Sequence, residues 1–363
     1  MRLFTLAAMA VSAAAFGVGA AATRAKAASP PNLSGPFVHD NLSVYFIHGP
    51  SAAGPVPLTL AEALARGTVH VRETGSVNNL EIENSGDADV FIQAGDIVKG
   101  GQQDRVLIMS MVLPSKSGKV PIGSYCVEQG RWSKRGAEDA KNFASSAEAL
   151  PSREAKLAMK APAKAQPDAI TPAGVTGRRT LGAGQRDDTS KRQADMWAAV
   201  SEVQAKLSAR VGAPVAAPQS ASSLQLSLEN ERVKATRDAF IKSLADKPVG
   251  DDVVGYVFAI DGKINSADQY PSNGLFKKMW PKLLAASATE AMGEARRHSA
   301  ATPAAAPAPA AVQAFLVSAE AAKPEEKELG KLAKQELRDG DTSLYVEARK
   351  ADGTWVHRNY LAK

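Results

Sequence analysis

Two short stretches of the sequence gather polar side chains of the types that bind and transform small anions. The first is AGDIVKGGQQDR at 94–105, which lies between two apolar stretches. Its cations, Lys99 and Arg105, can bind a phosphate or a carboxylate, and an arginine can form two parallel hydrogen bonds to such a group. Its adjacent glycines permit positive φ and let a ligand approach the backbone closely. The stretch predicts a ligand-binding loop formed by Lys99, Gly100, Gly101, Gln103 and Arg105.

The second stretch is CVEQGRW at 126–132, which ends another apolar segment. If the strands beside the two stretches pair, both polar stretches fall at one end of one sheet. The carboxyl groups of Asp104 and Glu128 could then share acid/base work, and Arg131 would orient the bound group. Trp132 would form a wall of the pocket.

Cys126 has two interpretations. Nearby cations could lower the pKa of its thiol and make it a nucleophile, so the catalytic candidates are Asp104, Glu128 and Cys126. Its apolar neighbours Tyr125 and Val127 instead favour a small buried side chain.

The polar loop also has a purely structural interpretation. It lacks the GK[ST] end of a Walker loop and the GxGxxG spacing of a dinucleotide site. A glycine turn between two strands, with Asp104 and Arg105 in a structural salt bridge, fits the same residues. An open cleft with Lys99 and Arg105 unpaired would favour ligand binding. A buried, mutually satisfied set of charges would favour a structural network.

The chain offers little for a metal or a disulfide. Its single cysteine permits no internal disulfide and no zinc site built from cysteines. Its five histidines are scattered and form no HxxH or HExxH pair. We therefore predict no metal site, and the sequence leaves any cofactor unknown.

The first residues are typical of an export signal. Arg2 precedes an apolar segment rich in alanine, and AKA at 25–27 fits a small-x-small cleavage site. Cleavage would leave Ala28 as the new terminus and place the protein in a bacterial periplasm or outside the cell. An uncleaved membrane anchor is the alternative. After cleavage no stretch approaches the ~18 continuous apolar residues of a spanning helix, so we expect no stable membrane insertion.

The charge of the chain excludes one class of partner. The formal net charge is +6, and losing the three basic residues of the signal leaves 41 basic and 38 acidic residues, or +3. This charge is too mild to predict binding to nucleic acid. An anionic small molecule remains a candidate partner, and the sequence names no protein partner.

The elements that must position the polar stretches follow from hydrophobic periodicity. Between residues 42 and 130 short alternating segments are separated by Gly, Asn and Asp, which predicts a sheet or small sandwich of about six strands. Residues 190–247 carry amphipathic helical stripes. A buried strand follows at 252–260, then a long helix in which Pro281 predicts a kink or a fresh start. We predict an α+β fold: an N-terminal, mainly antiparallel β-sheet, packed helices, a further strand and a C-terminal β-hairpin.

Composition divides the chain into segments. The predicted order is a signal peptide at 1–27, a disordered segment at 28–35, an α+β domain at 36–297 with a flexible loop insertion at 161–189, an Ala/Pro-rich linker at 298–311, and a β-rich extension at 312–363 that packs on the domain.

The motifs also carry a resemblance. In chain order AGDIVKGGQQDR, CVEQGRW, the MWAAV helix, VVGYVFAIDGKI followed by Asp268, and LFKKMWPKLLAASATEA resemble the ARG and rhodanese-phosphatase-superfamily-associated protein domain. The similarity covers most of 36–297. Where the family often has a basic residue in a GGRQDR-like form, this chain has Gln102. The family is named for its gene neighbours, ADP-ribosylglycohydrolases and rhodanese-like phosphatases, and not for an activity. The resemblance therefore implies, by association alone, a substrate such as ADP-ribose or another NAD-derived, phosphate-bearing compound.

Two functions from different classes remain open. The protein is either a binder of a phosphate- or carboxylate-bearing small molecule, with catalysis as an undecided addition, or a non-catalytic envelope protein in which the two motifs form a structural polar network. In the first case Lys99 and Arg105 would bind the anion, and Glu128 or Asp104 would act as the base.

Overall fold

The computed structural model describes residues 30–160, 183–295 and 304–363. Its largest sheet has eight antiparallel strands in the order β1-β2-β12-β13-β17-β16-β15-β14. Strands from the two ends of the chain therefore form one sheet. Their bounds are β1 (Asn32–His39), β2 (Leu42–His48), β12 (Val253–Ile260), β13 (Lys263–Gln269), β14 (Pro324–Leu329), β15 (Ala333–Asp339), β16 (Ser343–Lys350) and β17 (Trp355–Ala362).

The chain between β2 and β12 builds two smaller sheets. A six-stranded antiparallel sheet has the order β11-β7-β8-β10-β5-β4, and a three-stranded sheet has the order β3-β6-β9, in which β3 and β6 are parallel. The bounds are β3 (Leu58–Thr59), β4 (Val69–Ser76), β5 (Asn79–Asn84), β6 (Val90–Ile92), β7 (Asp96–Gly100), β8 (Arg105–Leu107), β9 (Met111–Leu113), β10 (Gly118–Cys126) and β11 (Phe143–Ala149).

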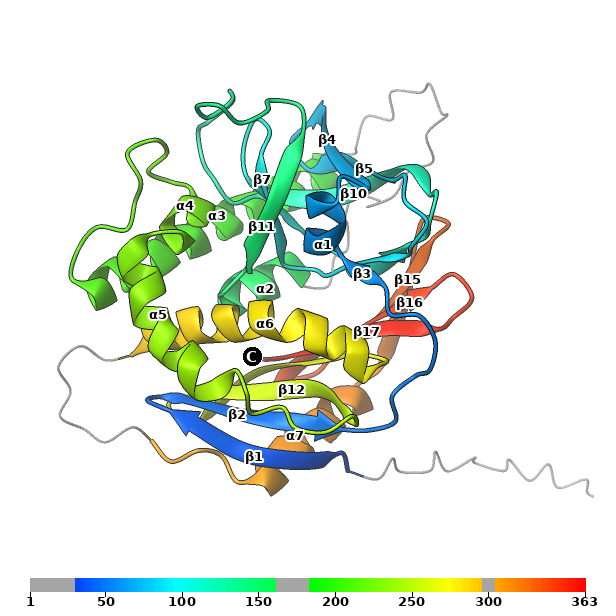
Figure 1. Ribbon diagram of the computed structural model, residues 1–363, viewed down its shortest axis with the longest axis vertical. Coiled ribbons are helices and arrows are strands. Elements are labelled where there is room, and N and C mark those ends of the chain that lie inside the picture. The colour runs from blue at the N-terminus through cyan, green and yellow to red at the C-terminus, as the bar shows by residue number, and fades with distance from the viewer. Residues whose placement is uncertain (1–29, 161–182, 296–303) are drawn as a thin grey trace, which may run out of the picture.

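The helices lie mostly between the large sheet and the smaller ones. In Figure 1, α6 crosses the middle of the molecule with β11 and α1 on one side and β12 and β2 on the other. The bounds are α1 (Leu60–Ala65), α2 (Arg153–Lys160), α3 (Ala183–Val211), α4 (Leu224–Leu228), α5 (Glu231–Leu244), α6 (Asn273–Glu294) and α7 (Pro309–Ala321).

The centre of the large sheet is covered on both faces, which explains why β12 is apolar throughout. Tyr256 and Phe258 belong to the main core with Trp280 of α6, whereas Val257 packs with Val312 of α7. Successive side chains of a strand point to opposite faces, so a strand covered on both sides needs apolar residues at every position. The predicted α+β class is confirmed, with mainly antiparallel sheets, packed helices and a C-terminal hairpin.

Local sequence signals account for several element ends. Thr59 and Glu62 form the capping box that begins α1. Asp261 and Gly262 adopt φ of 48° and 73°, and this turn closes the β12–β13 hairpin.

Three predicted segments differ from the structure. β1 begins at Asn32 because it pairs with β2, so the segment predicted to be disordered to residue 35 is a strand from there. Of the loop predicted at 161–189, residues 161–182 lie outside the described residues, and 183–189 belong to α3. The predicted β-rich extension contains helix α7, and its strands continue the large sheet through the β13–β17 pairing.

Pro281 does not start a new helix. α6 runs continuously from Asn273 to Glu294 with Pro281 inside it. A proline within a helix costs about 3 kcal/mol. Buried side chains on both sides of it, including Trp280 and Leu283, anchor the two halves to the same core, and tertiary packing of this kind outweighs local propensity.

Candidate functional site

The two polar motifs meet in space. β8 pairs with β10 so that Arg105 lies opposite Cys126, and β7 pairs with β8 so that Val98 lies opposite Arg105. The pairing of the two strands, which the sequence left open, is therefore present. The loop 101–104 and the segment after Cys126 lie at the same end of the six-stranded sheet.

Asp104 is the centre of a buried network. Its two carboxylate oxygens accept hydrogen bonds from the guanidinium of Arg135 at 3.0 and 3.1 Å. They also accept from the Ser223 hydroxyl at 2.8 Å and from the backbone N–H of Gly100 at 2.9 Å. The side chain of Asp104 is completely buried. A carboxylate with four donors is held firmly and has no contact with solvent.

Glu128 joins the same network. Arg131 donates to both of its oxygens at 2.7 Å, and the backbone N–H of Asp104 donates at 2.9 Å. Burial alone would raise the pKa of Glu128, but these hydrogen bonds hold it below its ordinary value. Arg131 also donates to the carbonyls of Gly100 and Gly101 at 3.2 and 3.1 Å. Glu128 is therefore an ionised anchor for Arg131.

The remaining cations of the first motif are paired as well. Arg105 is fully buried, donates to the carbonyl of Gln103 at 2.8 Å and lies 3.4 Å from a carboxylate oxygen of Glu73. Lys99 forms a salt bridge of 2.7 Å with Glu229. The structure thus brings neither Lys99 nor Arg105 to an open cleft. The buried amide of Gln103 has no hydrogen-bond partner in the described part of the chain.

The two glycines make room for protein atoms. Gly101 has a φ of +55°, and a Cβ there would lie 2.5 Å from the ring of Phe143 and 2.7 Å from Glu73. Gly100 has a φ of +111°. Only glycine combines this backbone conformation with such close contacts.

Cys126 and Trp132 differ in their exposure to solvent. The Cys126 side chain is buried, and burial raises its pKa to about 11. It is therefore a protonated thiol at neutral pH and lacks the thiolate that a nucleophile needs. Trp132 is 53% exposed and does not wall the network.

A cavity of about 280 Å³, which we call the groove cavity, lies beside Asp96 in the first part of the first motif. It is bounded by α1, β11, α5 and α6, whose arrangement around α6 can be followed in Figure 1. The first residue of β7, Asp96, lines it and binds Lys282 at 2.9 Å. Two more cations line it, Arg237 and Lys278.

Each cation of the groove cavity has an acidic partner. Arg237 binds Glu148 at 2.7 and 3.0 Å, and Lys278 binds Glu62 at 3.1 Å. Arg237 is only 7% exposed, and its Nε has no partner among the described residues. The cations of the groove cavity are therefore paired, and Arg237 contributes one buried donor that the described chain does not satisfy.

One family matches nearly the whole chain. It is described as the ARG and Rhodanese-Phosphatase-superfamily-associated Protein domain, and the match covers residues 31–361. The chain belongs to this family. No curated protein and no solved structure matches it. The family description records associated proteins and states no activity, so function must be argued from the side chains.

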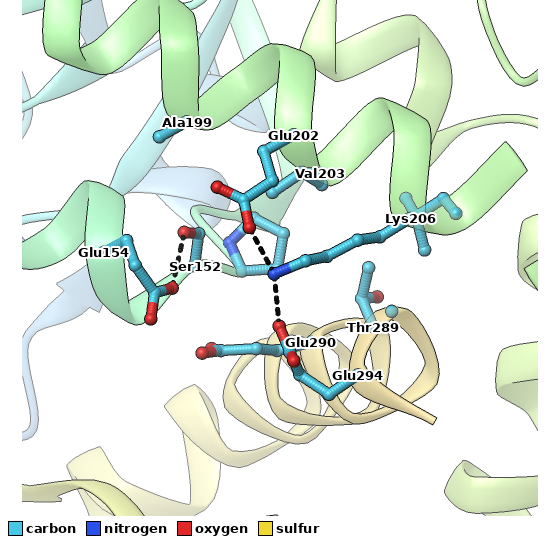
Figure 2. A pocket seen from close by; sticks show the side chains of 12 residues that line it. Ser152, Glu154, Ala199, Glu202, Val203, Lys206, Thr289, Glu290 and Glu294 are labelled. Carbon is cyan, nitrogen blue, oxygen red and sulfur yellow. Dashed lines mark hydrogen bonds and ion pairs between the residues drawn. The ribbon is translucent and has the colours of Figure 1, made fainter. Parts of the chain in front are cut away.

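A smaller pocket of about 20 Å³ lies between α3 and α6, with room for a single water molecule. Figure 2 shows Lys206 reaching between Glu202 and Glu294, at 2.6 and 2.5 Å. Burial raises the pKa of Glu290, which also lines this pocket. Lys206 already fills the acidic surroundings, so this pocket is a weaker ligand site than the groove cavity.

Two absences bear on the site. In residues 30–160, 183–295 and 304–363, no group of three or more His, Cys, Asp or Glu side chains could hold a metal ion. Across the same residues, no helix combines the length and the apolar character needed to span a membrane.

Sequence reasoning missed the partners that complete both sites. Arg135 and Ser223 donate hydrogen bonds to Asp104. Glu73 accepts a hydrogen bond from the backbone N–H of Gln102 in the polar loop. Lys282 and Arg237 line the groove cavity. The only local signal among them is that Ser223 caps α4. The cations look like ordinary surface charges because their partners are distant in sequence.

Proposed function

We propose that this protein binds a phosphate- or carboxylate-bearing small molecule in the groove cavity. The observation that carries the proposal is the convergence of Lys278, Lys282 and Arg237 on one concave cavity of about 280 Å³. Ligand pockets usually measure ~300–1,000 Å³, so the size supports a compact anion such as a sugar phosphate. Such a fragment is also part of ADP-ribose, the substrate class to which the family description points by association.

The cations retain capacity for a ligand. A lysine ammonium has three donors and an arginine has five. The Nη atoms of Arg237 serve Glu148 and Thr289, which leaves its Nε available. An anion in the cavity would add charge-assisted hydrogen bonds without breaking the existing pairs.

The second candidate function concerns the two motifs and is favoured by a specific observation. Asp104, Glu128 and Arg135 are buried and, together with the partly buried Arg131, mutually satisfied, which supports a structural network. In our proposal this network has a role in binding, because it fixes the end of the β7–β8 hairpin whose first residue, Asp96, lines the groove cavity. A non-catalytic envelope protein that meets another protein remains the alternative.

Export is part of the proposal. The signal-like segment 1–27 lies outside the described residues, and its sequence pattern supports cleavage before Ala28. Expression of the full chain in a bacterium, followed by fractionation and N-terminal sequencing of the product, tests this. A periplasmic or secreted product beginning at Ala28 supports export, and a cytoplasmic product beginning at Met1 contradicts it.

The binding experiment uses the protein from Ala28 onward. Its melting temperature is measured with inorganic phosphate, ribose 5-phosphate, ADP-ribose and citrate. At ~100 times its dissociation constant a ligand stabilises the fold by about 2.7 kcal/mol, which raises the melting temperature by a few degrees. Lys282→Gln should weaken binding at least tenfold. Lys277→Gln is the control, because Lys277 neighbours the cavity on α6 but is half exposed.

The outcomes separate the candidates. A stabilising anion whose affinity falls in Lys282→Gln and not in Lys277→Gln supports the groove cavity. If Lys99→Gln weakens binding instead, the ligand lies at the polar loop. No stabilisation by any of the four anions contradicts the binding proposal and favours the structural alternative.

A further inference from the structure

Apolar side chains make up half of the lining of the groove cavity. Six of its twelve lining residues are apolar, namely Leu60 and Ala61 of α1, Ala147 of β11, and Met279, Pro281 and Ala285 of α6. Leu60, Met279 and Ala285 are buried. Ala147 and Pro281 are exposed. The cavity is therefore open to solvent and presents apolar side chains to a molecule that enters it.

The charged side chains around the cavity balance one another. They form three ion pairs, which are Lys282 with Asp96, Arg237 with Glu148, and Lys278 with Glu62. Three cations and three carboxylates leave no net charge for a ligand to neutralise. A monoanion can share the protons of a lysine with its present partner, because an ammonium group has three donors. A second negative charge would lie close to the carboxylates without a cation of its own, which is costly in a partly buried site.

The same lining suits an apolar body better than the hydroxyl groups of a sugar. Apolar side chains offer a hydroxyl no hydrogen bond, and a hydroxyl that loses water without gaining a partner opposes binding. The carboxylates of Asp96 and Glu148 already accept hydrogen bonds from Lys282 and Arg237. Methylene groups have the opposite balance, since each one that leaves water for an apolar wall favours binding.

Helix α6 places the cationic and the apolar parts of the cavity side by side. Lys278 and Lys282 are one helical turn apart, so their side chains leave the same face of α6. Ala285 is three residues further along and also lines the cavity. Two ammonium groups next to an apolar wall are the arrangement that a ligand with one anionic group and an apolar body requires.

We propose that the ligand of the groove cavity is a monocarboxylate with a short apolar body, such as an acyl chain of about six to eight carbons. This inference rests on the anion binding proposed above and narrows it to one class of ligand. An apolar cavity of ~150 Å³ holds one benzene molecule, and the groove cavity measures about 280 Å³. The carboxylate binds at Lys278 and Lys282, and the acyl chain packs on the apolar wall.

The test measures dissociation constants by isothermal titration calorimetry. The ligands are acetate, butanoate, hexanoate and octanoate, with ribose 5-phosphate and inorganic phosphate for comparison. Each methylene group added between butanoate and octanoate should tighten binding about threefold to fourfold. Hexanol, which lacks the carboxylate, should bind at least tenfold more weakly than hexanoate.

Two variants fill the cavity from different elements. Ala147→Phe places a ring in the cavity from β11 and should weaken octanoate binding at least tenfold. Ala61→Phe does the same from α1, and Ala61 is partly exposed. Ala144→Phe is the matched control, because Ala144 is an exposed alanine of β11 that does not line the cavity. Circular dichroism shows which variants are folded, and the chain-length series on the wild type decides the proposal even if neither cavity-filling variant folds.

The outcomes separate this inference from the anion binding on which it rests. A gain with chain length that Ala147→Phe or Ala61→Phe removes and Ala144→Phe keeps supports the inference. Ribose 5-phosphate or phosphate binding that Lys282→Gln weakens, without any gain along the carboxylate series, overturns it and leaves the proposed anion site in place. A gain that persists in both cavity-filling variants also overturns it, because the acyl chain then binds elsewhere. If neither the carboxylates nor the phosphates bind, both proposals fail.

Discussion

Asp104 and Glu128 share one donor, because Nη1 of Arg135 lies 3.0 Å from Asp104 and 3.3 Å from Glu128. Two buried carboxylates this close would repel each other without a cation between them. Arg135 and Arg131 supply that compensation from one loop segment. The residues that the sequence marks as acid/base candidates are therefore held as ionised partners of arginines, which makes the network a clamp on the β7–β8 hairpin.

Replacing Arg135 should destabilise the fold strongly. Arg135→Ala leaves two buried carboxylates without their shared cation, and breaking a buried pair in this way costs about 3–5 kcal/mol. Urea denaturation measures the loss in the free energy of unfolding. Lys134→Ala is the control, since Lys134 is exposed, and it should change stability by less than about 0.5 kcal/mol. Equal effects of the two variants would mean that the clamp contributes little.

Glu128 should make stability depend on pH in the acid range. Its pKa in the folded state is below the ordinary 4.5, so the unfolded chain binds more protons once the pH falls toward 4.5. Its contribution is present above pH 4.5 and is lost as the pH falls through the folded-state value. Unfolding free energies measured at pH 3–7 should fall less steeply at the acid end in Glu128→Gln than in the wild type. Parallel curves would show that Glu128 is not a stabilising carboxylate.

Cys126 should behave as an inert thiol. Burial and a pKa of about 11 leave almost no thiolate at pH 7.5. The native protein should react with a thiol reagent such as DTNB at least 100 times more slowly than the urea-unfolded protein. Cys126→Ser should keep any activity found for the wild type. Fast labelling of the native protein, or loss of activity in the variant, would restore Cys126 as a nucleophile candidate.

The parts of the fold that follow from the sequence are those encoded within a few residues. The capping box of Thr59 and the turn at Asp261–Gly262 depend on local patterns, whereas the sequence alone left open whether the strands beside the two motifs pair. The placement of β13 beside β17 does not depend on local patterns, because it joins Asp268 to Asn359 across 91 residues. The distant partners of the site share this limit, since Asp104 and Ser223 are 119 residues apart. Hydrophobic periodicity predicts which face of an element is buried, and it contains no information about which polar group lies opposite.

Lys160 should give the protein an unusual gain of stability in mild alkali. It is fully buried, and burial lowers its pKa from 10.5 to about 8. Between these two values the unfolded chain binds more protons than the folded chain, so the free energy of unfolding rises with pH. Lys160→Met keeps the volume and removes the charge, so it should abolish the rise between pH 8 and 9.5. The comparison ends there because buried tyrosines such as Tyr256 and Tyr270, whose pKa values are raised in the folded state, reverse the slope at higher pH. Urea denaturation at several pH values measures both slopes, with Lys277→Met as the half-exposed control. If the wild type and Lys160→Met show the same slope, Lys160 keeps an ordinary pKa and the interior around Asn359 is more hydrated than the structure indicates.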